Sequence, residues 1–391
     1  LLAEQILEKT DTLHQPATTT KHDPGGPDLR PDVPADSPIL IVSNEEWDGP
    51  RYSKHRYALA LQQYRQVYFI DPVNRWKPRH FFQWRVNAKQ TPEGVIVLSY
   101  RNLIPLLGGR LASINDWVVQ HRLSRFMMRH DKQRPLFWSF DPARLLTPRR
   151  LNALRSVYHC VDDQVNRREE ERILAQNCDH VLCIARELQP RFIPYSNSVH
   201  FLPHGLSAAD FDTQLPQNGL PAPMGYALYI GNINDRHHFE LWEHLFATAP
   251  DQHFVIVGPT NVTDPIGQRL IKARLPNVHI LPPVPYNELA PLIAGAGCGF
   301  LYLKHDHPAN RKKKKKVVQF LAQGKPFFCS WLSEYADREG LVYMSDDYDN
   351  AIQQFTSWRR VGEPAQAREE RLKFANSLLF DNLFNHLPFR L

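Results

Sequence analysis

Several features that would assign this sequence to a familiar class are missing from it. Its 391 residues contain no run of about 18 apolar residues, which a membrane-spanning helix needs. The five cysteines form no C-x-x-C pair and are odd in number, so buried reduced thiols are expected rather than a zinc site or a disulfide scaffold. The patterns G-x-G-x-x-G, H-E-x-x-H and G-x-S-x-G and the Walker loop are also absent. These absences disfavour nicotinamide dehydrogenases, zincins, α/β-hydrolases and P-loop NTPases.

The first ten residues lack the basic start and the long apolar run of a signal peptide, because Leu1–Thr10 carries acidic residues. We therefore expect an intracellular, cytoplasmic protein. The chain is also too long for one ordinary hydrophobic core, since single cores stop growing near roughly 250–300 residues. Two domains are the natural expectation.

The net charge of +6 is unevenly distributed along the chain. Between Arg51 and Arg155 there are 20 Lys and Arg but five acidic residues, a net charge of +15, so the rest of the chain carries −9. A basic segment of this size suggests that one face meets something anionic, such as nucleic acid, a phosphorylated ligand or a membrane surface. Composition does not choose among the three.

The order of apolar and amphipathic segments predicts an α/β protein with two Rossmann-like domains. Residues 1–37 are polar and rich in Thr, Pro and Gly, which indicates a disordered or linker tail. After residue 37, short apolar runs alternate with helix-like stretches, the pattern of βαβ units and parallel sheets. We predict domains at 38–210 and 211–370 that face each other across a cleft, and a helix at 371–391 that packs back on the first domain.

The expected elements follow these two series on either side of a Pro- and Gly-rich bridge at Leu215–Gly225. The predicted strands are Ile39–Ser43, Val67–Asp71, Val95–Tyr100, Leu136–Phe140, Val157–Val161, Val181–Ile184, Ala227–Ile230, Phe254–Val257, Val278–Leu281, Gly299–Leu303 and Pro326–Cys329. The predicted helices include Lys54–Tyr64, Ile114–Arg129, Arg167–Asn177, Phe239–Thr248, Ile266–Leu275, Tyr286–Ala294 and Lys316–Gln323.

A glycine turn follows the first strand of the second series. Gly231 and Asn232 end this strand before a polar turn and a helix, an arrangement that exposes backbone N–H groups to a phosphate. Arg236 adds a cation where a diphosphate needs one. The alternative is that Gly231 only turns the chain.

A lysine-rich run precedes the last predicted helix of this series. Arg311–Lys316 opposes the helix macrodipole, which is unfavourable unless an anion lies there. Lys316 sits on the helix itself and is the best candidate for a ligand-binding lysine. The alternative, for the first lysines above all, is a solvated charged segment.

Two carboxylates, Asp162 and Asp163, end an apolar strand in the first series, where they could bind sugar hydroxyls. Capping of the following helix would explain one of them but less easily both. The preceding His159 alternates into the strand and is expected to pack. In the loop after the first strand, Arg51 and His55 are further candidates, because ligands contact the first βα loop in this fold class.

Together these segments resemble GT-B glycosyltransferases of the family 4, or glycosyl transferases group 1, type. The resemblance covers roughly residues 38–375 and is strongest in the second half. It rests there on Gly231, Val255–Pro259, Asn277–Ile280, Val284–Leu289 and K-x-x-Q-F-L-A-x-G-K-P from Lys316 to Pro326, where the family has K-x-x-E-Y-L-A-x-G-K-P. In the first half, Pro203–Leu206 resembles P-N-G-V, and Val157–Asp163 with Ala175–Ile184 resembles elements of bacterial envelope-sugar transferases.

The resemblance implies a GT-B fold whose second domain holds a nucleotide-sugar donor, with UDP or GDP as the nucleotide. The family's diphosphate site matches Gly231, Asn232, Arg236 and the helix lysine Lys316. The glutamate that binds ribose in the family is replaced by Gln319, and Tyr286 lies in the turn that flanks the base. His237 and His238 stand where the family has an Arg and Lys phosphate pair.

Family 4 enzymes retain the anomeric configuration and often need no metal ion, so fixed cations stabilise the leaving diphosphate. The resemblance therefore implies no metal site and no cofactor other than the donor. Asp162 would face the transferred sugar from the first domain, and we assign catalytic roles to Asp162 and Lys316. The expected acceptor is an envelope polysaccharide or a lipid-linked glycan, and the Arg51–Arg155 segment is expected to meet an anionic membrane surface from the cytoplasmic side.

Two other interpretations stay open. Gln319 and the missing cation pair are compatible with a catalytically inactive GT-B protein that binds or scaffolds. A nucleic-acid-binding protein is disfavoured, because the basic residues are not interleaved with a recognisable RNA or DNA module.

Overall fold

The computed structural model describes residues 33–49, 51–73, 85–102, 110–217, 219–304, 315–338 and 340–391, with the backbone alone for 110–114 and 315. Most of the predicted tail and the basic residues Arg311–Lys314 lie outside the described residues.

The first half of the chain forms an eight-stranded sheet in the order β3-β4-β2-β1-β5-β6-β7-β8. Its strands pair in parallel except for β3, which pairs antiparallel with β4 at one edge. The apolar runs predicted six of these strands. They did not predict β3, which is polar and exposed, or the three-residue β8. The strands are β1 Ile39–Val42, β2 Val67–Ile70, β3 Asn87–Gln90, β4 Ile96–Ser99, β5 Leu136–Ser139, β6 Arg155–Cys160, β7 His180–Cys183 and β8 Val199–Phe201.

Helices cover both faces of this sheet. Successive side chains of a strand point to opposite faces, so Ile39 and Ile41 of β1 pack with α2 while Leu40 and Val42 pack with α3 and α4. A strand buried on both faces is apolar throughout, which is why β1 reads as a continuous apolar run. The helices are α2 Ser53–Gln62, α3 Arg110–His130, α4 Arg168–Asn177 and the single turn α5 Gln189–Phe192.

The second half contains a six-stranded parallel sheet in the order β13-β11-β9-β14-β15-β16, and a two-stranded parallel pair formed by β10 and β12. The two-residue strands were not predicted, because two residues carry no periodicity. The strands are β9 Tyr226–Ile230, β10 Ile233–Asn234, β11 Phe254–Val257, β12 Thr260–Asn261, β13 Val278–Leu281, β14 Ala296–Leu301, β15 Phe327–Cys329 and β16 Tyr343–Met344. The helices are α6 Phe239–Thr248, α7 Pro265–Lys272, α8 Leu289–Gly295, α9 Lys315–Leu321, α10 Tyr348–Val361, α11 Ala365–Asn376 and α12 Phe380–Phe384.

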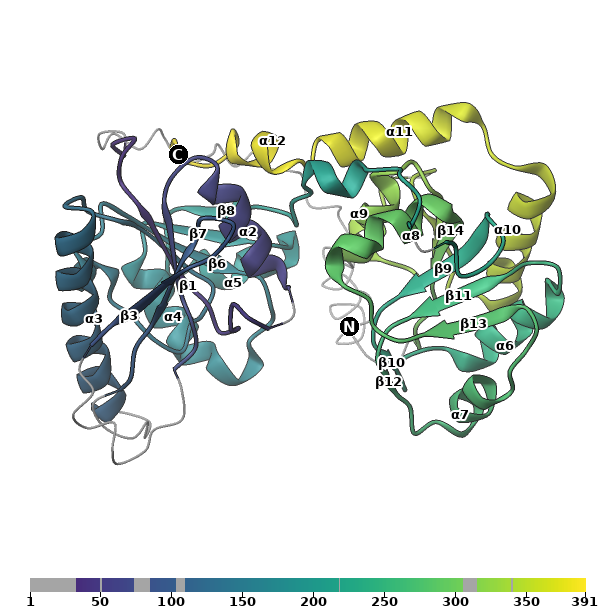
Figure 1. Ribbon diagram of the computed structural model, residues 1–391, viewed down its shortest axis with the longest axis horizontal. Helices are drawn as coiled ribbons and strands as arrows, with labels where there is room; N and C mark the ends of the chain where they lie inside the picture. The colour runs from purple at the N-terminus through teal and green to yellow at the C-terminus, as the bar shows by residue number, and fades with distance from the viewer. Residues whose placement is uncertain are drawn as a thin grey trace, which may run out of the picture. The chain divides into compact units, whose positions relative to one another are not determined.

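The end of the chain returns to the first sheet, for which the sequence predicted a helix at 371–391. Helix α11 ends at Asn376, and the returning segment is the short α12 and the residues after it (Figure 1). The ring of Phe380 lies 5.0 Å from that of Tyr57 on α2, and Phe389 lies 5.1 Å from His180 of β7. These aromatic contacts attach the carboxyl terminus to the first half.

Residues 33–37 pack against the first half of the chain, although the sequence assigned them to the tail. The buried Arg65 donates hydrogen bonds to the carbonyls of Val33, Pro34 and Ser37. A guanidinium with five donors can satisfy several carbonyls of an irregular segment at once. Polar composition alone did not reveal this contact.

All five cysteines are free and buried, as the sequence predicted. Burial raises the pKa of each thiol, so none is poised as a thiolate. Within the described ranges, no three His, Cys, Asp or Glu side chains gather as metal ligands. None of the helices described is both long enough and apolar enough to cross a bilayer.

His159 of β6 is fully buried among the rings of Tyr57, Trp138 and Phe140, which confirms that it packs. Burial lowers the pKa of its imidazole from 6.5 to about 3, so in the unfolded chain the ring binds a proton at a higher pH than in the folded chain. The stability that this group supplies is complete above pH 6.5 and is lost as the pH falls toward 3.

We therefore expect His159 to cost about 1.4 kcal/mol of unfolding free energy for each pH unit below roughly 6. Urea unfolding of the wild type and of His159→Phe between about pH 7 and 4 measures it, and the variant should show a shallower loss. Equal pH slopes for the two proteins would contradict the expectation.

Candidate active site

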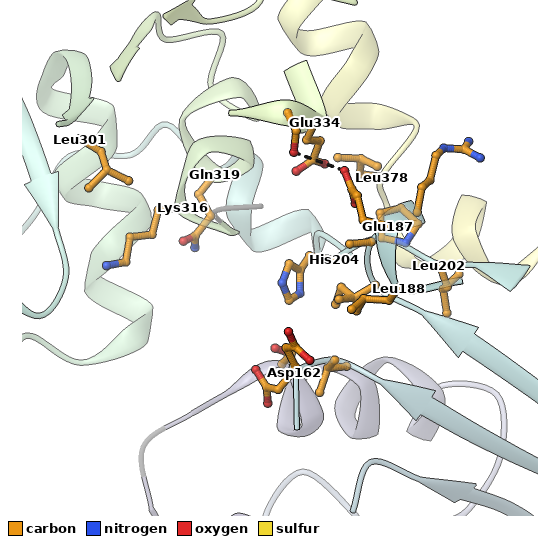
Figure 2. Close-up of a pocket in the computed structure, with 18 of the residues that line it drawn as sticks. Asp162, Glu187, Leu188, Leu202, His204, Leu301, Lys316, Gln319, Glu334 and Leu378 are labelled. Carbon is orange, nitrogen blue, oxygen red and sulfur yellow. Dashed lines mark hydrogen bonds between the residues drawn. The ribbon is translucent and has the colours of Figure 1, made fainter. Parts of the chain in front are cut away.

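A cavity of about 2020 Å³ is lined by residues that follow the carboxyl ends of strands in both sheets. Ligands of parallel α/β sheets bind at this edge because the loops that connect strands to helices converge there. Figure 2 shows Lys316 and Gln319 on α9 facing the cavity, with Asp162 on its other side. The predicted site residues that line the cavity are Asp162, Asn232, Arg236, Tyr286, Lys316 and Gln319, and the further candidates Arg51 and Asp163 line it as well.

Gly231 lies directly against the ammonium group of Lys316. A Cβ atom at Gly231 would stand 1.7 Å from Lys316 Nζ, and the φ of Gly231 is +152°. The same ammonium lies 5.3 Å from the ring centre of Tyr229. Gly258 is constrained by backbone instead, since its Cβ would stand 2.0 Å from the carbonyl oxygen of Gly231. Both glycines are therefore required for close approach, and together they hold the turn on which the Lys316 amine lies.

The polar turn after Gly231 separates exposed residues from buried ones. Asn232 and Arg236 are exposed and line the cavity. His237 is buried, with its Nε2 2.8 Å from Tyr229 Oη, and the side chain of His238 accepts a hydrogen bond at the start of α6. The two histidines, which stand where the similar family has a cation pair, thus hold the turn and the helix in place.

Tyr286 and Gln319 bind a carboxylate that the sequence analysis missed. Asp210 accepts hydrogen bonds from Tyr286 Oη at 2.9 Å and from Gln319 Nε2 at 3.1 Å, and it forms an ion pair with Arg56. Burial of Asp210 favours its neutral form, but the charge of Arg56 and the hydrogen bonds it accepts outweigh this and lower its pKa. The sequence did contain a signal that Asp210 accepts hydrogen bonds, because Ser207-x-x-Asp210 fits the capping-box pattern. The structure forms this capping box.

Asp162 and Asp163 follow β6 but have different surroundings. Asp163 accepts hydrogen bonds from Arg168 at 2.6 Å and from Arg191 at 2.7 Å. The side chain of Asp162 is 61% exposed, and its Oδ2 lies 3.6 Å from Lys54 Nζ. Neither carboxylate caps the helix that follows. Asp162 is thus the more accessible of the two at the cavity.

The loop before α2 places its two candidates differently. His55 is fully buried, with Nδ1 accepting from the backbone of Tyr52 at 3.0 Å and Nε2 lying 2.9 Å from the carbonyl of Glu46. Arg51 lines the cavity and pairs with Glu93 at 3.0 Å. The structure therefore removes His55 from the candidate site, because its ring is used to fix the start of α2.

No model of a known protein family matches the sequence, and no curated protein matches it. Solved structures do resemble it. Sucrose-phosphate synthase from Thermosynechococcus elongatus has a TM-score of 0.60 and 13% identity, over 89% of this chain and 96% of that chain. HepE from Anabaena, solved with UDP and glucose, has a TM-score of 0.58 and 12% identity, over 87% and 95%. A glycosyltransferase from Rickettsia africae has a TM-score of 0.62 and 9% identity, over 89% and 96%.

These similarities extend over nearly the whole length of each neighbour and include both sheets. The chain has the GT-B fold, which confirms the fold class that the sequence predicted.

Proposed function

We propose that the protein is a glycosyltransferase that moves a sugar from a nucleotide-diphosphate donor to an acceptor. The observation that carries this proposal is the Lys316 ammonium held on the Gly231 turn, inside the cavity of a GT-B fold. A fixed cation beside a backbone turn suits a diphosphate, because charge that develops on a leaving phosphate is stabilised by preorganised groups. The UDP and glucose bound by HepE support a sugar nucleotide as the ligand class.

The donor is proposed to lie along the second sheet. Its diphosphate contacts Lys316, Asn232 and Arg236, its ribose contacts Gln319, and Tyr286 flanks its base, UDP and GDP being the nucleotides considered. Lys316 and Arg236 supply positive charge as the diphosphate leaves, so we propose that the reaction needs no metal ion.

The acceptor is proposed to enter along the first sheet. Asp162 faces the transferred sugar from that side, and we propose that transfer retains the anomeric configuration, as in family 4. An envelope polysaccharide or a lipid-linked glycan is the proposed acceptor, reached from the cytoplasmic face of a membrane.

Titration and turnover with sugar nucleotides test the proposal. The protein is incubated with UDP-hexoses and GDP-hexoses, and binding is followed by calorimetry and nucleotide release by chromatography. We expect one nucleotide series to bind and to be released as its diphosphate, and UMP or GMP, which lack the second phosphate, to bind more weakly. No binding of any sugar nucleotide would overturn the proposal, and tight binding without release would favour an inactive binding subunit.

Helix α3 presents a basic face that also carries exposed apolar side chains. Its opposite face is buried against the first sheet, whereas Trp117 and Met128 are 57% and 45% exposed. Basic side chains near an anionic surface contribute about 1 kcal/mol each, and tryptophan favours the membrane interface. We propose that this face docks on an anionic membrane surface. Its exposed residues are Trp117, His121, Arg125, Met128 and Arg129.

Charge reversal on this face should weaken vesicle binding. The variant Arg125→Glu/Arg129→Glu is expected to bind vesicles containing phosphatidylglycerol at least tenfold more weakly than the wild type, since about 1 kcal/mol is lost per cation. Cosedimentation measures this, and Lys272→Glu/Arg360→Glu, which reverses two exposed charges on other helices, is the matched control. Equal binding of the wild type to anionic and to pure phosphatidylcholine vesicles would refute the docking surface.

A further inference from the structure

Asp210 does not line the cavity, but two side chains that do line it are bound to this carboxylate. Its Oδ1 accepts hydrogen bonds from Tyr286 and Gln319, and its Oδ2 accepts from Arg56 and from the backbone and hydroxyl of Ser207 at 2.8 and 3.0 Å. Asp210 is 4% exposed. In such surroundings an unmatched donor or acceptor costs the full desolvation of that group, so each of these bonds constrains its partners.

The amide of Gln319 uses its nitrogen for these bonds. Nε2 donates to Asp210 and lies 3.3 Å from Tyr286 Oη. Because the Tyr286 hydroxyl gives its proton to Asp210, its oxygen can accept the second N–H of the amide. The carbonyl Oε1 takes part in neither bond. An amide held in this way offers an acceptor to a ligand hydroxyl.

A glutamate at position 319, the residue of the similar family, has no donor to offer when ionised. It would place a second carboxylate about 3 Å from Asp210 in a buried site, where two such groups cannot both be ionised. The glutamine is therefore not an arbitrary departure. It supplies one of the two donors to Oδ1 of the Asp210 carboxylate, the other being the Tyr286 hydroxyl.

We propose that Asp210 is a positioning residue of the donor site and that Asp210 and Gln319 form a matched acid and amide pair. In this pair, Asp210 orients Gln319 so that Oε1 faces the ribose hydroxyls, and it holds Tyr286 beside the base. This orienting role rests on the proposed function, whereas the pairing itself does not.

Arg56 connects the pair to the first half of the chain. It extends from α2, forms the ion pair with Asp210, and its guanidinium carbon lies 5.3 Å from the ring centre of Tyr286. Asp210 therefore joins a first-sheet helix to the two donor-site side chains. Changes at Asp210 are expected to alter donor affinity even though its carboxylate does not touch the donor.

Exchange of the acid and the amide tests the pair. The variants are Gln319→Glu, Asp210→Asn and the double variant Gln319→Glu/Asp210→Asn. In the double variant the amide introduced at position 210 can donate to the new carboxylate while its carbonyl accepts from Arg56 and Ser207. We expect Gln319→Glu to lower the unfolding midpoint and to weaken UDP or GDP binding about tenfold, and the double variant to recover most of both losses. Asp210→Asn alone should weaken nucleotide binding, because the Gln319 amide must turn.

Gln323→Glu, in the turn that directly follows α9, is the matched control. Gln323 is buried and its Nε2 donates to the carbonyls of Asp212 and Ala290, so this variant also loses donors, but donors to backbone carbonyls rather than to the Asp210 carboxylate. Gln323→Glu should lower the unfolding midpoint and leave the nucleotide affinity of the folded protein near that of the wild type. Adding Asp210→Asn to it should not raise the unfolding midpoint again.

The two readouts separate this inference from the proposed function. If the wild type binds no nucleotide, the proposed function fails, but recovery of the unfolding midpoint in the double variant still supports the pair. If Gln319→Glu has the unfolding midpoint of the wild type, the pair is overturned. It is also overturned if the double variant has an unfolding midpoint no higher than that of Gln319→Glu. Should Gln319→Glu fail to fold, a folded double variant supports the pair and an unfolded one overturns it.

Discussion

Replacing Lys316 by alanine is expected to lower kcat/KM for the sugar-nucleotide donor by about 10²–10³-fold, the usual cost of removing one preorganised group that stabilises a leaving charge. The ammonium lies against the Gly231 turn and over the ring of Tyr229, so its position is defined by the surrounding structure rather than by solvent. Its removal leaves the diphosphate with the exposed Arg236 as its proposed cation. Steady-state kinetics and calorimetric titration with the nucleotide measure the loss.

The Lys316→Ala protein should remain folded. A lysine near the start of α9 opposes the helix macrodipole, so its removal is expected to change the free energy of unfolding by no more than about 1 kcal/mol. Lys272→Ala, at the exposed end of α7, is the matched lysine control and should keep full activity. A Lys316→Ala enzyme that retains kcat/KM within a few-fold would remove this lysine from the donor site.

Replacing Gly258 by alanine is expected to cause the largest loss of stability among single changes at the site. The new Cβ would stand 2.0 Å from the carbonyl oxygen and 2.7 Å from the carbonyl carbon of Gly231, and the φ of Gly258 is +145°. Both contacts are with backbone atoms, so the clash cannot be relieved by the movement of a side chain. Strain of about 1–3 kcal/mol from the dihedral and a similar cost from overpacking predict a loss of roughly 3–5 kcal/mol in the free energy of unfolding.

Gly231→Ala gives the contrasting result. Its Cβ would stand 1.7 Å from Lys316 Nζ, which can swing away, and 2.7 Å from Tyr229 Oη. Both are side-chain atoms rather than backbone, so the loss of stability should be smaller than for Gly258→Ala while nucleotide binding is lost. Gly219→Ala is the control for φ alone, because Gly219 has a φ of +86° and no atom within 4 Å of the added Cβ. Urea unfolding ranks the three variants, and a Gly258→Ala protein as stable as Gly219→Ala would contradict the backbone contact.

The sheets and one side of the candidate site could be predicted because their signals are local. Strands buried on both faces must be apolar along their length, so β1, β9 and β11 were visible as short runs. The resemblance to GT-B glycosyltransferases implied that Gly231 and Lys316 share one diphosphate site, and the structure brings Lys316 onto Gly231. The polar edge strand β3 lacked such a signal.

The contacts that hold the site together were not predictable in the same way. Asp210 is 154 positions from Arg56 and 109 positions from Gln319, and no periodicity connects such distant residues. His55 has a residue type and a loop that suit a ligand, yet its ring is buried and capped by backbone groups. Residue type indicates which chemistry a side chain is capable of, but only its neighbours settle whether it is free to perform it.

The amino-acid order thus determined the two α/β halves, the burial of the cysteines and the residues that meet at the strand ends, because local apolar patterning and chain direction suffice for these. The tertiary structure decided which of two adjacent carboxylates is more accessible, which groups the Gln319 amide is bonded to, and how both halves are joined through Asp210. These depend on side chains from distant segments that share one buried site, where every donor needs an acceptor and every charge a partner.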